Sequence, residues 1–150
     1  MKKRALIITD EPENRSFKTI HNLKQRLEGG DNKVDIIAFS TDKTYLNNEK
    51  VSRKGGLLNQ LTVLLKEGNY SVIVISLKIK YLSQLFLEDN DIIKVIRSLS
   101  PGTAVFVFGA SRILGKVKPT QNFFLYARSG VAKLTRQISR DVIDYAMLHN

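Results

Sequence analysis

The sequence contains no cysteine and only two histidines, His21 and His149. Without thiols the chain can form no disulfide and can carry out no thiolate chemistry. Two imidazoles are too few for a histidine-rich metal centre, and zinc sites built on cysteine are excluded altogether. We therefore predict a fold that needs neither disulfides nor a bound metal.

Long hydrophobic runs are also missing, because no apolar stretch approaches the roughly 18 residues of a membrane span. The basic start is followed by a short apolar run, Ala5–Thr9, and then at once by Asp10 and Glu11, which is too short for the hydrophobic region of a secretion signal. The 150 residues are 43% hydrophobic and 25% charged, as in a globular protein. We expect one cytoplasmic domain over residues 1–150 and no membrane partner.

Acidic residues are absent from one long segment of a chain whose net charge is +10. Between Ile92 and Arg140 there is no carboxylate, and the basic residues of this segment are Lys94, Arg97, Arg112, Lys116, Lys118, Arg128, Lys133, Arg136 and Arg140. Such a segment attracts phosphates, nucleic acid, an acidic carrier or an acidic partner protein, with a strength that falls as salt rises. The charge can equally serve solubility alone, and both interpretations stay open.

What the sequence does contain is an alternation of strand and helix signals. Apolar runs bounded by turn residues predict strands at Ala5–Thr9, Val34–Phe39, Tyr70–Ser76 and Thr103–Phe108. Helical spacing predicts helices over 17–27, 57–66 and 92–99, and a last helix from near Tyr126 almost to the end of the chain. The polar segment Thr41–Gly56 is expected to be a loop.

This order predicts an α/β fold, either flavodoxin-like or a truncated Rossmann fold. We expect a parallel sheet of four to five strands with helices on both faces, because right-handed crossovers place successive helices there.

The last expected helix has two contrasting sides. Its apolar residues share one narrow face, namely Val131, Leu134, Ile138 and Val142. Three cations lie opposite, about one turn apart, namely Lys133, Arg136 and Arg140. The apolar face either packs on the core or forms an interface, and the basic face is either solvated or binds an anion or a partner.

This helix and the strand before it resemble the short-chain dehydrogenase/reductase family, in particular the 3-oxoacyl-carrier-protein reductases. The similar segments are Gly102–Ser111, which looks like the strand that carries the catalytic serine, and Tyr126–Val142, which looks like the helix that begins at the catalytic tyrosine. The resemblance implies that Ser111 would polarise a substrate carbonyl and that Tyr126 would be the general acid. NADPH would then be the cofactor.

Two departures from this family predict that the chemistry is lost. The lysine expected four residues after the tyrosine is replaced by Gly130, and the next ammonium, Lys133, lies roughly 10 Å along the helix. An unassisted phenol with a pKa near 10 is a poor proton donor or acceptor at neutral pH. The first strand is also followed by the acidic segment 9–14 without a glycine, which would repel a pyrophosphate.

A second resemblance is to the receiver domains of two-component systems. Leu6–Arg15 is similar to their opening, where paired acids such as Asp10 and Glu11 would hold Mg²⁺. The position of the phosphoacceptor, however, is occupied by Ser76. This resemblance therefore implies a pseudo-receiver that works without phosphorylation.

These observations predict a noncatalytic, Rossmann-like interaction module or accessory subunit without a cofactor, which associates through Val131, Leu134, Ile138 and Val142. Its expected partner is a second copy or another protein, such as an acidic carrier. The alternatives are an NADPH-dependent reductase using Ser111, Tyr126 and Lys133, a pseudo-receiver, and a nucleic-acid-binding protein that uses the basic segment 92–140.

Overall fold

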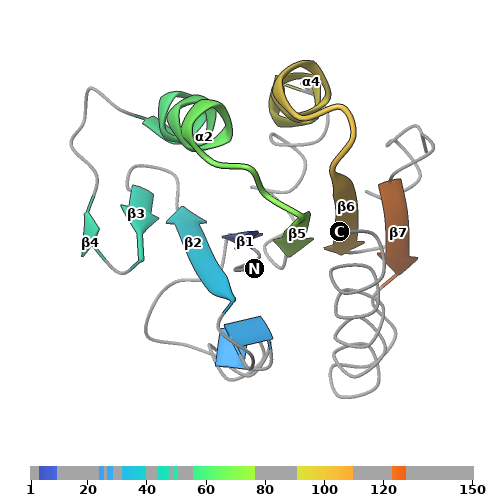
Figure 1. Ribbon diagram of the computed structural model, residues 1–150, viewed down its shortest axis with the longest axis horizontal. Helices are drawn as coiled ribbons and strands as arrows, with labels where there is room; N and C mark the ends of the chain where they lie inside the picture. Colours follow the sequence, from blue (N-terminus) through green and yellow to red (C-terminus); the bar gives the residue numbers. More distant parts are fainter. Residues whose placement is uncertain are drawn as a thin grey trace.

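A computed structural model describes residues 4–9, 24–25, 27–28, 32–39, 44–47, 49–50, 56–76, 91–109 and 123–127 of the chain. These residues form a seven-stranded sheet in the order β4-β3-β2-β1-β5-β6-β7 (Figure 1). The strands are β1 (Arg4–Thr9), β2 (Lys33–Phe39), β3 (Thr44–Leu46), β4 (Glu49–Lys50), β5 (Val72–Ser76), β6 (Ala104–Gly109) and β7 (Phe123–Ala127). The helices are α2 (Gly56–Glu67) and α4 (Asp91–Leu99).

Helical residues lie on both faces of the sheet. Helices α2 and α4 lie side by side over one face, whereas residues 24–25 and 27–28 are helical and lie on the other (Figure 1). In that second region Leu27 is buried, and Lys24 and Glu28 form an ion pair one helical turn apart. The layered α/β architecture predicted from the sequence is therefore confirmed. No helix among the described residues is long and apolar enough to cross a membrane.

The central strands are parallel and buried. Strands β2, β1, β5, β6 and β7 pair in parallel, as the crossover connections require. The side chains of Leu6–Ile8 in β1 and of Val72–Ile75 in β5 have no exposed surface at all. Strands covered on both faces read as continuous apolar runs, which is why the sequence locates them well.

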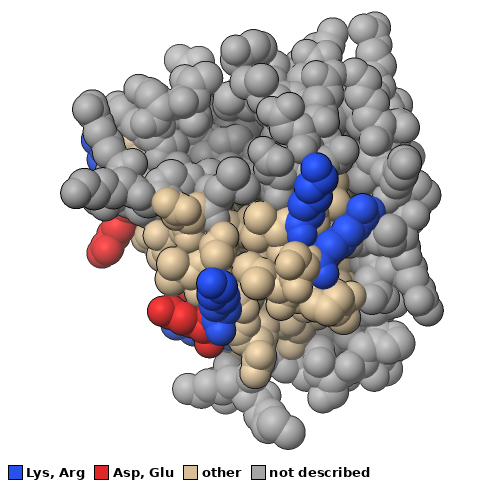
Figure 2. Space-filling model, turned by 90° about the horizontal axis from the view of Figure 1, so that it is seen from above, with Lys and Arg blue, Asp and Glu red and all other residues tan. Residues whose placement is uncertain are grey.

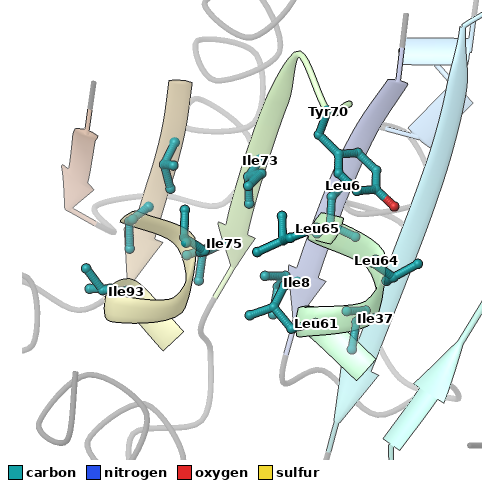
Figure 3. Close-up of a cluster of buried hydrophobic side chains, with 13 residues drawn as sticks. Leu6, Ile8, Ile37, Leu61, Leu64, Leu65, Tyr70, Ile73, Ile75 and Ile93 are labelled. Carbon is teal, nitrogen blue, oxygen red and sulfur yellow. The ribbon is translucent and has the colours of Figure 1, made fainter. Parts of the chain in front are cut away.

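The core on the α2–α4 face is a layer of leucine and isoleucine side chains (Figure 3). Leu61, Leu64 and Leu65 of α2 project towards alternate residues of the sheet, such as Leu6 and Ile8 of β1. Helix α4 adds further isoleucines beside them, and Tyr70 closes one end of the layer. Full burial of each such side chain contributes about 1.5–3 kcal/mol to folding.

The segment Thr41–Gly56, expected to be a loop, contains two strands instead. Strand β3 pairs antiparallel with β2 and β4 pairs antiparallel with β3, so the sheet is mixed and has more strands than the four to five predicted. Asn47 makes the turn with a positive φ of 50°, a conformation that asparagine tolerates. The prediction was wrong because these short strands are held by pairing, β3 with β2 and β4 with β3, which a local pattern does not reveal.

The last strand is a second correction. Tyr126 lies in β7, with Phe108 of β6 as its register partner, and does not begin a helix. The run Phe123–Ala127 is apolar and rich in aromatic residues, a composition typical of strands. The remainder of the expected helix, residues 128–150, lies outside the described residues.

Candidate functional site

The strand order reverses between β1 and β5. From β1 the chain passes to β2 on one side and later crosses to β5 on the other. In open α/β sheets such a switch point opens a crevice at the carboxyl ends of the two strands, and ligands bind there. The carboxyl ends of β1 and β5 are therefore the place in this fold where a functional site is expected.

Two hydroxyl residues end these strands. Thr9, the last residue of β1, is in register with Ser76, the last residue of β5, and the side chain of Thr9 is completely buried. The same register row continues through Phe108 of β6 to Tyr126 of β7. Hydroxyl groups donate and accept hydrogen bonds. Because Thr9 is completely buried, its side chain belongs to the interior of the fold rather than to an open surface.

The row brings together residues that the sequence treats separately. In the sequence alone, Ser76 stands at the position where a receiver domain would have its phosphoacceptor, Tyr126 is a candidate general acid, and Thr9 is the end of a predicted strand. Neighbouring strands lie about 4.8 Å apart, so the backbones at Ser76 and Tyr126, with β6 between them, are roughly 10 Å apart. Thr9 could have been singled out as the hydroxyl that ends a buried apolar run.

The other sequence-predicted site residues lie outside the described residues. They are Asp10, Glu11, Ser111, Lys133, Arg136, Arg140, Val131, Leu134, Ile138 and Val142. Their roles therefore remain predictions. Among the residues that the structure does describe, no cluster of histidine and carboxylate side chains could hold a metal ion.

The opposite end of the same strands carries a buried ionic network that sequence reasoning missed. The carboxylate of Asp35 in β2 is 3% exposed and accepts bonds at Oδ2 from Arg4 Nε (2.9 Å), Arg4 Nη2 (2.8 Å) and Tyr70 Oη (2.8 Å). Its Oδ1 accepts a bond from Asn47 Nδ2 at 3.1 Å. The guanidinium of Arg4 also lies over the Tyr70 ring, 5.0 Å from its centroid, which is a favourable cation–π distance.

The network sets the charge states of its members. Burial alone would raise the pKa of Asp35, but the hydrogen bonds from Asn47, Tyr70 and Arg4 and the charge of Arg4 outweigh it and lower that pKa below its ordinary value. Burial, the hydrogen bond to Asp35 and the charge of Asp35 all raise the pKa of Tyr70. Asp35 is therefore a stable carboxylate and Tyr70 a stable neutral phenol at neutral pH.

This network has a structural role. Asp35 joins residues of β1, β2, the β3–β4 turn and the segment before β5, and both of its oxygens are occupied. Asn47 adds a second tie, because its Oδ1 accepts the backbone N–H of Ile36 at 2.9 Å. A carboxylate with its acceptors filled and its pKa lowered is a poor general base. The network therefore fixes the strands at the end opposite the switch point.

The structure is similar to the crystal structure of Drosophila melanogaster DJ-1beta. The TM-score is 0.57 and the sequence identity is 14%, over 97% of this chain and 91% of that chain. No protein-family model matches the sequence, and no curated protein matches it. At this identity the likeness shows the fold alone, which is a DJ-1-like, flavodoxin-like α/β fold with a mostly parallel sheet.

This likeness corrects both resemblances drawn from the sequence. The chain has a DJ-1-like fold, and neither the short-chain reductase nor the receiver assignment holds. The reductase resemblance rested on one strand and one helix, a pair that parallel α/β folds share, and its tyrosine lies within strand β7. The receiver resemblance rested on a first strand followed by acids, which is no more specific.

Proposed function

We propose that this protein is a noncatalytic α/β interaction module, an accessory subunit that associates with a second copy through its C-terminal segment. The observation that carries the proposal is the position of β7 at one end of the sheet order. The apolar stripe of Val131, Leu134, Ile138 and Val142 begins four residues after β7 ends at Ala127. The stretch of sequence that carries this stripe therefore follows directly on the last strand of the described sheet.

The local structure at Tyr126 supports a binding role over a catalytic one. A tyrosine and a lysine cooperate in proton transfer when both lie on one helix, about a turn apart. Tyr126 lies in an extended strand and does not begin a helix, so the one-turn spacing that such a pair needs is not set up at this residue. The whole sequence also lacks a cysteine, which removes the thiolate as a nucleophile.

Sedimentation velocity over a range of concentrations tests the proposal. The wild type is expected to form a dimer, and Leu134→Glu is expected to weaken it at least about tenfold, because a charge would be buried in an apolar contact. Thr135→Glu, next to the stripe but not on it, is the matched control and should leave the dimer intact. A protein that stays monomeric at high concentration, with or without the Leu134 substitution, would contradict the proposal.

A second candidate function, binding of a polyanion, is favoured by the charges on α4. Lys94 is exposed and Arg97 half-buried, and three residues of spacing place them on one side of the helix. Figure 2 shows Lys and Arg side chains reaching out over the largely uncharged α2–α4 face. Lys94 and Arg97 belong to the segment 92–140 that contains no carboxylate.

Salt-dependent binding to a labelled oligonucleotide tests this candidate. Binding should weaken steeply with salt, and Lys94→Glu should reduce the slope of log affinity against log salt by about 1 or more. Lys33→Glu, an exposed cation at the amino end of β2, is the control and should change it less. Equal effects of the two substitutions would indicate net charge rather than a site.

A further inference from the structure

Helices α2 and α4 lie level with each other because their two helix–strand units repeat the same geometry. At the end of α2 the N–H of Gly68 donates to the carbonyl oxygen of Leu64 at 2.8 Å. At the end of α4 the N–H of Ser100 donates to that of Ile96, also at 2.8 Å. Connections of equal length lead on to β5 and β6, which are in register from their first residues. Residues that precede the two strands by equal distances therefore lie at about the same height above the sheet.

The outer surface of these two helices has a centre without charge. Val63 of α2 is 45% exposed, and Val95 of α4, at the same height, is partly buried. Helix α2 has no charged residue before Lys66, although 25% of the whole chain is charged. The outward side of a solvated helix is normally polar and charged. A centre depleted of charge is instead typical of surfaces that a partner protein covers.

Two lysines border this uncharged centre. Lys94 directly precedes the valine of α4, and Lys66 follows the valine of α2 by just under one turn, so the valines lie between them in height. Both lysines are exposed, and neither forms an ion pair within the described part of the chain. The carboxylates of the two helices stand at their ends, at Glu67 and Asp91. In Figure 2 blue side chains rise from a tan, uncharged surface.

We propose that the outer surface of α2 and α4 docks an acidic, amphipathic segment of another protein. Apolar side chains of that segment cover Val63 and Val95, and its carboxylates meet Lys66 and Lys94. The inference rests on the polyanion binding put forward above, whose cations it shares, and it names the ligand. Opposite charges at the border of an apolar contact fix its register and speed the encounter.

The chemistry of this surface favours an acidic protein over two other occupants. Single-stranded nucleic acid is gripped by cations together with aromatic rings on which bases stack, and neither α2 nor α4 contains an aromatic residue. A second copy of the chain would bring the same lysines to the contact, and each copy carries a net charge of +10. Like charges would then meet, which opposes association.

Fluorescence anisotropy with two labelled peptides tests the inference on the intact protein. Both peptides contain the same leucine, alanine and glutamate residues. In one peptide the leucines recur at helical spacing and form a single apolar face, and in the other their order is scrambled. The wild type should bind the amphipathic peptide at least about tenfold more tightly, because only that peptide can cover the valines while its glutamates reach the lysines.

Substitutions on α2 locate the contact. Val63→Asp should weaken binding of the amphipathic peptide at least about tenfold, because a carboxylate would be buried against an apolar face beside other carboxylates. Asn69→Asp adds the same charge at an exposed position beyond the end of α2 and is the matched control, with an expected effect below about twofold. Lys66→Gln should weaken binding and make it less dependent on salt, whereas Lys33→Gln on β2 should do so less. Circular dichroism checks that each variant is folded.

The outcomes separate this inference from the candidate function on which it rests. Equal binding of the two peptides, with equal effects of Val63→Asp and Asn69→Asp, overturns the acidic segment and leaves a general attraction for polyanions. An oligonucleotide of the same charge that binds more tightly than the amphipathic peptide, and that depends on Lys94, overturns it in favour of nucleic acid. If neither peptide nor oligonucleotide binds, both the inference and the polyanion candidate fall.

Discussion

The two ends of the central strands are built for different purposes. At the amino end, Asp35 is buried and bonded to Arg4, Tyr70 and Asn47, so that charge and hydrogen-bonding capacity are consumed inside the fold. At the carboxyl end, the switch point between β1 and β5 carries Thr9 and Ser76, which lie in register. The difference teaches that the buried ion pair and its hydrogen bonds are concentrated at the amino end of the strands, whereas the carboxyl end carries two hydroxyl residues in register.

We expect the largest effect on the free energy of unfolding from removing the carboxylate of Asp35. This substitution is the strongest test of the difference between the two ends of the strands. Asp35→Ala should lower the free energy of unfolding by about 3 kcal/mol, because breaking a buried ion pair leaves an uncompensated charge and Arg4 is only partly exposed. Urea denaturation measures the change. Glu49→Ala, an exposed carboxylate on β4, is the control and should change it by less than about 0.5 kcal/mol.

The pH dependence of stability in the wild type and in Asp35→Ala tests the same point. Because folding lowers the pKa of Asp35, its stabilising contribution is present above the unfolded value of about 3.9 and is lost as pH falls towards the folded pKa. The difference in stability between wild type and Asp35→Ala should therefore be constant near neutral pH and shrink below about pH 4. A difference that persists unchanged into strong acid would show that the charge of Asp35 is not what stabilises this end.

Removing one hydroxyl from the network should have the next largest effect. Tyr70→Phe keeps the buried ring but deletes the 2.8 Å bond to Asp35, at a cost of about 1.5–3 kcal/mol because the acceptor is charged. Since folding raises the pKa of Tyr70, the contribution of its phenol is present below the unfolded value of about 10 and is lost as pH rises further. The two proteins should therefore converge in stability above about pH 10, as thermal unfolding can measure. Tyr45→Phe, outside the network, is the control.

A smaller effect is expected where the backbone passes close to the network. A Cβ on Gly68 would lie 2.9 Å from Arg4 Nη1, 3.0 Å from Tyr70 Cε2 and 3.1 Å from the carbonyl oxygen of Leu64. Gly68→Ala should therefore cost about 1–3 kcal/mol through overpacking. Gly102→Ala is a matched control, because nothing lies within 4 Å of the added carbon, and it should be neutral or stabilising. Equal stabilities of the two variants would mean that Arg4 and Tyr70 are not held in place.

The sequence predicts the buried central strands and misses the strands at the two edges of the sheet. The reason is the same in both cases, because a strand is visible in a local pattern only where burial leaves a continuous apolar run. Ala5–Thr9 and Tyr70–Ser76 read correctly because burial on both faces leaves a continuous apolar run. Strands β3 and β4 carry no such run, and they are held instead by antiparallel pairing, β3 with β2 and β4 with β3. At the other edge, helical spacing predicts a helix from near Tyr126, and the family resemblance implies the same, although the aromatic run around Tyr126 is typical of a strand.

The ionic network could not be predicted, because its members are far apart in the chain. Asp35 is separated from Arg4 by 31 residues and from Tyr70 by 35. Only the three-dimensional pairing of β1, β2 and β5 brings them together, and no local spacing encodes it. The single available signal was one acid within the otherwise apolar run of β2. Buried acids are usually paired, so that signal predicts a cation nearby without identifying it.

The smallest effect is expected at the turn that ties the β3–β4 hairpin to the network. Asn47→Gly keeps the positive φ of 50° accessible but removes the bonds to Asp35 and to the backbone N–H of Ile36, which should cost about 1 kcal/mol because Asn47 itself is exposed. Asn47→Ala should cost about 1 kcal/mol more, since alanine is strained in the left-handed region. Urea denaturation of the two variants separates the side-chain bonds from the backbone conformation. If Asn47→Gly is as stable as the wild type, pairing with β2 alone holds the hairpin, and the stabilising network at the amino end stops at Asp35, Arg4 and Tyr70.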